Sequence, residues 1–173
     1  MQVTIISDIH NNEVNLKKVL DFCAKKKIET IICCGDVASK ETLDFLNDNF
    51  SGNILLTFGN AEYDDLRKLG EDKEYKKTFL FPDFGKVVIE KRNVAFVHYP
   101  EIAKRLARTG KYDFVFYGHT HKPWTEKGVA DENGKEYIML NPGTTGGEIY
   151  LPTFAVWDTE GNKFELVRIH ELK

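Results

Sequence analysis

Four of the five histidines in this chain lie at the ends of short apolar runs, together with two aspartates and one asparagine. Three of these runs reach the polar residue through a glycine, at positions 35, 59 and 118. Imidazole, carboxylate and amide groups without a thiolate suit Mn²⁺, Fe²⁺, Zn²⁺ or Ni²⁺, and they disfavour a structural zinc of the four-cysteine kind. The candidate metal ligands are Asp8, His10, Asp36, Asn60, His98, His119 and His121.

The number of candidate ligands indicates more than one metal ion. Seven ligands are too many for one ion that keeps an open position, but they suit two ions that share a bridging carboxylate. Such a pair, about 3.5–4 Å apart, activates water and binds a phosphoryl group. Each short motif alone is weak evidence, whereas the joint pattern argues against coincidence. The fifth histidine, His170, falls near the chain end, and we interpret it as structural or exposed.

The apolar runs that precede these residues read as buried strands. They are apolar throughout and rich in β-branched residues, as in a parallel sheet that helices cover on both faces. Parallel strands end at a common edge, and open α/β sheets bind their ligands beyond the carboxyl ends of the strands. The strands expected before the candidate ligands cover residues 3–6, 30–34, 54–58, 93–97 and 113–117.

Helices are expected between these strands. Asn12 and Ser39 are N-cap candidates, each followed by apolar residues at helical spacing. Residues 61–69 and 100–109 also read as helices, the first ending at Gly70 and the second at Gly110.

The final third of the chain has a different pattern. Asn133-Gly134 and Gly161-Asn162 are hairpin signals, and residues 124–130, 136–140, 153–157 and 163–169 read as the flanking strands. We expect this region to be largely antiparallel. Because the chain shows no linker, repeat or low-complexity segment, we predict one α/β domain over residues 1–173.

Composition limits the classes of partner. The chain has 173 residues, a net charge of −3 and a pI near 6.0, so electrostatics do not indicate a nucleic-acid partner. Its three cysteines are too few for a disulfide framework, and we expect Cys33 and Cys34 to be buried. No segment approaches the roughly 18 apolar residues of a membrane span, and the start does not read as a signal peptide. These features predict a soluble cytoplasmic protein.

The order of the motifs resembles that of the calcineurin-like metallophosphoesterases. They are Asp8-Ile9-His10, Gly35-Asp36, Gly59-Asn60, His98 and Gly118-His119-Thr120-His121. The short chain and the segment Asn141-Pro142-Gly143-Thr144 are similar to the YfcE-like small phosphodiesterases within that superfamily. The resemblance covers essentially the whole chain. It implies a two-sheet α/β/β/α sandwich with mixed sheets and helices on the outside.

The resemblance also implies a role for each candidate ligand. The first ion would be held by Asp8, His10, Asp36 and His121, and the second by Asp36, Asn60, His98 and His119, with Asp36 as the bridge. A hydroxide between the two ions would attack phosphorus in line, while Asn60 and His98 would help to stabilise charge on the phosphoryl oxygens. We expect two divalent ions, Mn²⁺ first, with Fe²⁺, Zn²⁺ or Ni²⁺ as alternatives.

Two positions depart from the family pattern. Many of these phosphatases carry a histidine after the Gly-Asn pair, where this chain has Ala61, which cannot transfer a proton. Loss of a general acid costs about 10²–10⁴-fold where the leaving group is poor. A substitute role for Glu62 is left open. His98 is followed by Tyr99 and Pro100 rather than by Gly-His, which changes the wall of the site, although plain packing is the favoured role for Tyr99.

The resulting prediction is a dinuclear metal-dependent phosphodiesterase that acts on a small phosphodiester. A phosphomonoesterase with the same site and a non-catalytic protein-binding scaffold of the same fold are the alternatives. An apolar edge that includes Phe79, Phe81 and Phe84 could support a homo-oligomer, but burial in the core is the favoured role for these residues. The segment at residues 141–143 is either a turn beside the metal site or a turn without further role.

Overall fold

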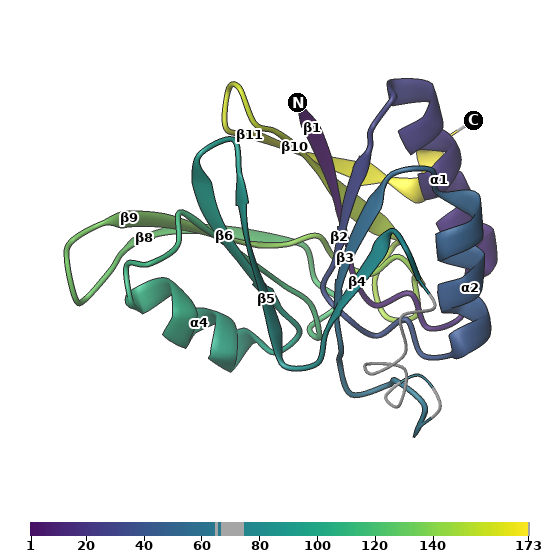
Figure 1. Cartoon of the computed structure of the whole chain (residues 1–173), viewed down its shortest axis with the longest axis horizontal. Coiled ribbons are helices and arrows are strands. Elements are labelled where there is room, and N and C mark those ends of the chain that lie inside the picture. The colour runs from purple at the N-terminus through teal and green to yellow at the C-terminus, as the bar shows by residue number, and fades with distance from the viewer. Residues whose placement is uncertain (65, 67–74, 173) are drawn as a thin grey trace.

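Two β-sheets pack face to face, and helices cover their outer faces (Figure 1). The computed structural model describes residues 1–64, 66 and 75–172. α1 (Glu13–Lys26) and α2 (Lys40–Asn49) lie on one sheet, and α4 (Pro100–Arg108) lies on the other. The predicted α/β/β/α sandwich is confirmed.

The first sheet has six strands in the order β11-β10-β1-β2-β3-β4. β1 through β4 run parallel, whereas β10 pairs antiparallel with both β1 and β11. Their bounds are β1 (Gln2–Ile6), β2 (Thr30–Cys33), β3 (Asn53–Thr57), β4 (Thr78–Phe81), β10 (Thr153–Asp158) and β11 (Lys163–Arg168).

The second sheet has five strands in the order β5-β6-β7-β9-β8. β6, β7 and β9 run parallel, and antiparallel β5 and β8 form the two edges. The predicted antiparallel final third holds for both C-terminal hairpins, yet β9 also pairs parallel with β7. Their bounds are β5 (Phe84–Ile89), β6 (Arg92–Val97), β7 (Phe114–Tyr117), β8 (Trp124–Val129) and β9 (Glu136–Asn141).

Local signals explain where the helices begin. The side chains of Asn12 and Ser39 accept hydrogen bonds from the backbone amides of Asn15 and Thr42, which confirms both predicted caps. The last predicted strand is one residue too long, because the chain turns into a short 3₁₀ helix at Ile169–Glu171. The predicted helix over residues 61–69 falls partly on residues outside the described part of the chain, namely 65 and 67–69.

Three apolar layers hold the sandwich together. Leu16 and Val19 of α1 pack on the first sheet, and Trp157 and Phe116 fill the space between the sheets. Ala103 lies between α4 and the second sheet. Full burial of a side chain as large as Trp157 makes the central layer costly to truncate, at about 3–5 kcal/mol for a change to alanine.

Two of the three aromatic residues expected in the core are exposed. Phe79 and Phe84 are 49% and 37% exposed, so their expected burial in the core is wrong. Both lie on edge strands, where one side lacks a neighbouring strand to cover it. Phe81 is half-buried and packs edge-on against Phe96, with ring centroids 5.2 Å apart.

The cysteines are all free and buried, as expected for Cys33 and Cys34, and burial raises the pKa of both thiols. None of the helices in the described part of the chain is both long enough and apolar enough to span a membrane.

Candidate metal centre

The loops that follow β1, β2, β3, β6 and β7 meet at one edge of the sandwich, which we call the ligand edge. Three of these strands belong to the first sheet and two to the second, so the edge joins both sheets. Each strand delivers its polar residues within one to four positions of its last residue. The ligand edge brings all seven candidates together: Asp8, His10, Asp36, Asn60, His98, His119 and His121.

One group at the ligand edge contains Asp8, His10 and His121, whose ligand atoms all lie within 4.8 Å of one another. His121 Nε2 is 3.3 Å from Asp8 Oδ1 and 3.3 Å from His10 Nε2. Asp36 Oδ2 lies 3.6 Å from His10 Nε2. Three side chains and a shared carboxylate therefore surround one position that suits a cation.

A second group lies on the other side of Asp36. The same Asp36 Oδ2 is 3.3 Å from His98 Nε2. Asn60 Oδ1 lies 3.1 Å from His98 Nε2 and 2.9 Å from His119 Nδ1. Asp36 thus faces both groups through one oxygen, which is the placement that a bridging carboxylate requires.

The hydrogen bond of His98 to the backbone fixes which ring nitrogen carries the proton. His98 Nδ1 lies 2.9 Å from the carbonyl oxygen of Cys34, which can only accept, so Nδ1 donates. In the neutral ring, Nε2 then has a lone pair that faces the oxygens of Asp36 and Asn60. Such a convergence of acceptors fits a cation, and a second hydrogen bond of this type orients most metal-bound histidines.

Electrostatics at the ligand edge hold the Asp36 carboxylate ionised. Burial opposes the charge of Asp36, but the hydrogen bond and charge of His98 and the amide of Ala61 outweigh it and lower the pKa of Asp36 to about 2. Burial likewise opposes the charge of His98, and its contacts with Asp36 raise its pKa nevertheless. The hydrogen bond to Asp8 raises the pKa of His121, and the charge of Glu148 adds to this effect. Metal ions bind the neutral imidazole, so these raised pKa values make metal binding compete with protonation.

Backbone geometry at the ligand edge is strained. Five of the seven candidates have positive φ angles, a region that costs a non-glycine residue about 1–2 kcal/mol. Strain of this kind persists where surrounding contacts force it, and it gathers at functional sites. The residues are Asp8 (54°), His10 (48°), Asp36 (57°), His119 (68°) and His121 (59°).

Two glycines allow the loops of the ligand edge to approach each other closely. A Cβ atom on Gly59 would lie 2.1 Å from Asp36 Oδ1, and one on Gly118 would lie 1.9 Å from Ser7 Oγ. Both distances are shorter than any real contact, so larger residues would displace the loops that carry Asn60 and His119.

Glu62 has a supporting role that the sequence did not reveal. Its side chain is buried, and its two oxygens accept hydrogen bonds from the backbone amides of Val37 (3.2 Å) and Gly59 (2.8 Å). The carboxylate therefore ties the loop that carries Asp36 to the loop that carries Asn60. Because the side chain is buried and each oxygen accepts from a backbone amide, the geometry favours a structural role for Glu62 over that of a substitute proton donor for Ala61.

Asn141 supports the loop after β7. Its Nδ2 donates to the carbonyl oxygen of Gly118 (2.9 Å) and to Thr120 Oγ1 (3.0 Å), while its Oδ1 accepts from the amide of Gly143. The turn at residues 141–143 thus lies directly behind His119 and His121. Asn141 is only 1% exposed, which marks it as a structural support for this loop. An Asn-Pro-Gly sequence does not reveal burial, so the sequence alone could not assign this role.

Tyr99 covers one side of the second group. Its ring lies 5.1 Å from the His98 ring and 5.2 Å from the His119 ring, measured between centroids. The favoured packing role of Tyr99 is therefore correct. Its ring packs on the rings of two candidate ligands, His98 and His119. Ala61 contributes only its amide, which donates to Asp36 Oδ1 at 2.8 Å.

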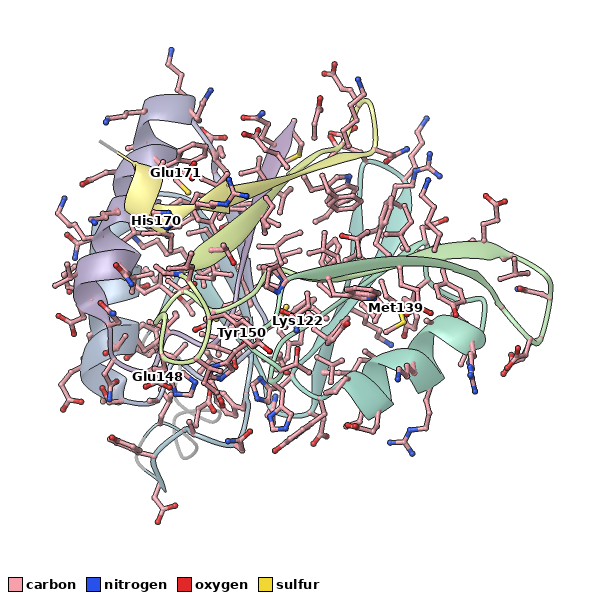
Figure 2. The ribbon with its side chains drawn as sticks, turned by 180° about the vertical axis from the view of Figure 1, so that it is seen from behind. Lys122, Met139, Glu148, Tyr150, His170 and Glu171 are labelled. Carbon is pink, nitrogen blue, oxygen red and sulfur yellow. The ribbon has the colours of Figure 1, made fainter. Side chains whose placement is uncertain are left out.

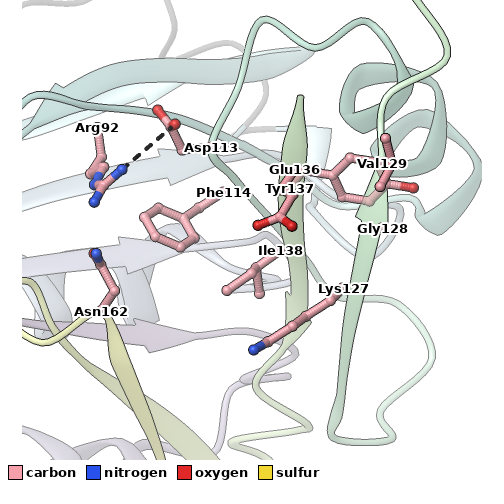
Figure 3. Close-up of a pocket in the computed structure, with 10 residues that line it drawn as sticks. All are labelled: Arg92, Asp113, Phe114, Lys127, Gly128, Val129, Glu136, Tyr137, Ile138 and Asn162. Atoms are coloured by element: carbon pink, nitrogen blue, oxygen red, sulfur yellow. Dashed lines mark ion pairs between the residues drawn. The ribbon is translucent and has the colours of Figure 1, made fainter. Parts of the chain in front are cut away.

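A cavity of about 470 Å³ lies at the other end of β6, β7 and β9 (Figure 3). It contains none of the seven candidates. Asp113 at its wall pairs with Arg92 (4.0 Å) and with Lys135 (3.1 Å), so this carboxylate already has permanent cations beside it. The cavity is separate from the ligand edge.

Known proteins share both the sequence pattern and this architecture. Phosphodiesterase MJ0936 of Methanocaldococcus jannaschii is 28% identical over 95% of this chain and 96% of its own. Phosphodiesterase YfcE of Escherichia coli K12 is 24% identical over 83% of this chain and 79% of its own. The solved structure of an archaeal phosphodiesterase superposes with a TM-score of 0.82 at 27% identity, covering 97% of this chain and 99% of that one.

The family model that matches the chain is described as the calcineurin-like phosphoesterase superfamily domain, and it covers residues 1–162. That match spans every loop of the ligand edge. The chain belongs to the calcineurin-like phosphoesterase superfamily.

Proposed function

We propose that this protein hydrolyses small phosphodiesters with two divalent metal ions bound at the ligand edge. The observation that carries the proposal is the position of Asp36 Oδ2, which lies 3.6 Å from a ligand of one group and 3.3 Å from a ligand of the other. The names of the relatives, two of them phosphodiesterases, support the same reaction.

The proposal assigns the seven residues to two ions. Asp8, His10, Asp36 and His121 would hold the first, and Asp36, Asn60, His98 and His119 the second. Bound divalent ions would supply an activated water and a Lewis acid for the phosphoryl oxygens. We propose Mn²⁺ first, with Fe²⁺, Zn²⁺ and Ni²⁺ as alternatives, because ligands of this kind do not by themselves select one of these ions.

The residues of the chain do the remaining work. The amide of Ala61 and the imidazole of His98 hold Asp36 ionised, and the carbonyl of Cys34 orients His98. Asn60 is exposed at the rim, where its amide group can also contact a phosphoryl oxygen. These contacts fix the donor atoms before substrate arrives, which is how preorganised sites lower a barrier.

Ala61 disfavours substrates with poor leaving groups. The position after Asn60 offers no side chain that can protonate a departing alkoxide. A phosphomonoesterase remains the second candidate, since the ligand set suits either reaction. A scaffold that binds other proteins is less favoured, because all seven ligand positions are filled and lie together.

Hydrolysis of bis-p-nitrophenyl phosphate by protein loaded with Mn²⁺ tests the proposal. Parallel loadings with Fe²⁺, Zn²⁺ and Ni²⁺, with metal content measured by elemental analysis, identify the ion. We expect turnover with at least one metal and a higher kcat/KM on the diester than on p-nitrophenyl phosphate. Folded protein that binds none of these ions and cleaves neither ester would eliminate the proposal.

We also propose one domain over the whole chain and a reducing, cytoplasmic setting. The three layers of core share the same two sheets, and the three cysteines are free and buried. A homo-oligomer stays a prediction, and the exposed side chains of Phe79 and Phe84 are consistent with it. Sedimentation of the purified protein would test it.

A further inference from the structure

The loop between β9 and β10 is fastened to the backbone of a candidate ligand. Thr144 is fully buried, and its hydroxyl donates to the carbonyl oxygen of Asp8 (2.9 Å) while accepting from the amide of Gly147 (3.1 Å). The amide of Gly146 donates to the same Asp8 carbonyl at 2.8 Å. Gly147 has a φ of +81°, which favours glycine. The residues that follow are therefore positioned by the ligand edge itself.

Glu148 is the first of these residues (Figure 2). Its Oε2 lies 3.9 Å from Nε2 of His10, a candidate ligand of the first ion, and its side chain is 55% exposed. The carboxylate thus borders the metal site from the solvent side. It adds a negative charge at a rim that anionic substrates must approach.

Three consecutive apolar residues come next. Ile149, Tyr150 and Leu151 are 72%, 44% and 66% exposed. Scattered apolar side chains are ordinary on a protein surface, but an uninterrupted exposed run calls for a functional explanation. This run directly follows Glu148, whose carboxylate lies 3.9 Å from the candidate ligand His10.

We propose that residues 148–151 select the substrate, with Glu148 disfavouring dianionic monoesters and the apolar run binding the organic substituent of a monoanionic diester. This inference rests on the proposed function and deepens it by naming the substrate class, namely a phosphodiester with an aromatic or apolar substituent. It also supplies a discrimination between diesters and monoesters that does not depend on Ala61.

The charge effect follows from Coulomb's law. A phosphomonoester carries about −1.5 to −2 charges at pH 7, whereas a diester carries one. Glu148 is more than half exposed, so an effective dielectric constant between about 40 and 80 applies, and one extra charge some 7 Å from its carboxylate then changes binding by about threefold to tenfold. Salt screens such an effect, since the Debye length falls to about 3 Å at 1 M ionic strength.

The first test replaces Glu148 by glutamine and compares two esters of one leaving group, p-nitrophenyl phosphate and methyl p-nitrophenyl phosphate. In metal-loaded protein at low salt, the kcat/KM ratio of monoester to diester should rise about threefold to tenfold in Glu148→Gln. The gain should shrink at high salt. Glu148→Asp retains the charge, and Glu165→Gln removes a charge from β11, so both should keep the ratio of the unaltered protein.

The second test addresses the apolar run. Tyr150→Ser should raise the KM for bis-p-nitrophenyl phosphate by about threefold to thirtyfold while changing kcat less than twofold, because the lost contact binds ground state and transition state alike. The KM for methyl p-nitrophenyl phosphate should change little. Leu166→Ser, at a residue 46% exposed on β11, is the matched control and should alter neither KM.

The outcomes separate this inference from the proposed function. An unchanged monoester-to-diester ratio in Glu148→Gln, or an equal rise in both KM values in Tyr150→Ser, would overturn the inference while leaving the hydrolase intact. A change of oligomeric state in Tyr150→Ser without any change in KM would show that the run contacts another subunit, and would overturn it too. Failure of the metal-loaded unaltered protein to cleave any of these esters would overturn both.

Discussion

The two ends of the sandwich pair their carboxylates differently. At the ligand edge, Asp8 and Asp36 are 0% and 1% exposed, and their ion-pair partners among the described residues are all histidines. At the opposite end, beside the cavity of Figure 3, Asp113 pairs with Arg92 and Lys135. A permanent cation completes the second arrangement. At the ligand edge, Asp8 and Asp36 have a compensating positive charge only when protons or metal ions supply it, and buried charges require such partners.

Neutralising one carboxylate at each end gives the largest expected contrast. Asp36→Asn removes the charged bridge and should lower kcat/KM on a diester by about 10²–10³-fold or more, together with loss of bound metal. Asp113→Asn is the control, and it should leave activity unchanged with a stability change within about 1 kcal/mol. Measured turnover, metal content and unfolding midpoints check both variants. Equal losses of activity in the two would remove the contrast.

Metal removal should affect the ligand edge alone. An ion present at 100 times its Kd stabilises the native state by about 2.7 kcal/mol, so chelation should lower the Tm and added Mn²⁺ should restore it. Amide hydrogen exchange locates the change. We expect faster exchange at the loops after β1, β2 and β7, with the β8–β9 turn unaffected. A Tm insensitive to every divalent ion would favour the scaffold alternative.

Two asparagines allow a matched comparison of supporting turns. Asn141→Ala removes the support behind His119 and His121 and should weaken metal affinity about 10–100-fold, as loss of a residue behind the ligands typically does. Asn133 makes similar contacts at the opposite end, with the carbonyl of Gly110 and the amide of Lys135. Asn133→Ala should lower the free energy of unfolding but leave the metal affinity, measured by calorimetry, unchanged. The reverse result would show that Asn141 is structural only.

The pH dependence of the metal-free protein should give the smallest effect. Two histidines of the ligand edge have raised pKa values in the folded state. Burial opposes the charge of His98, but its contacts with Asp36 raise its pKa, and the hydrogen bond to Asp8 raises the pKa of His121. Their contribution to stability is therefore complete below the unfolded pKa, near 6.5, and is lost as pH rises through the higher folded values. Metal affinity should increase over the same window. Denaturant unfolding at several pH values, with and without Mn²⁺, measures both trends.

Strand and helix signals in the sequence were strong because they are local. Continuous apolar runs predicted the buried parallel strands, and Asn12 and Ser39 predicted two helix starts. The same local reasoning failed at Phe79 and Phe84, which are apolar but lie on edge strands. It also missed the parallel pairing of β9 with β7, since a hairpin signal describes only one neighbour of a strand.

The sequence by itself determined which residues could bind metal, because ligand type and position after an apolar run are properties of the chain. Tertiary structure decided that loops from two separate sheets meet, that Asp36 faces both groups, and that Glu62 and Asn141 hold the loops in place. It also decided that Glu148 borders His10, a contact between residues 138 positions apart. Contacts at that separation depend on how the sheets pack, and no local pattern encodes it.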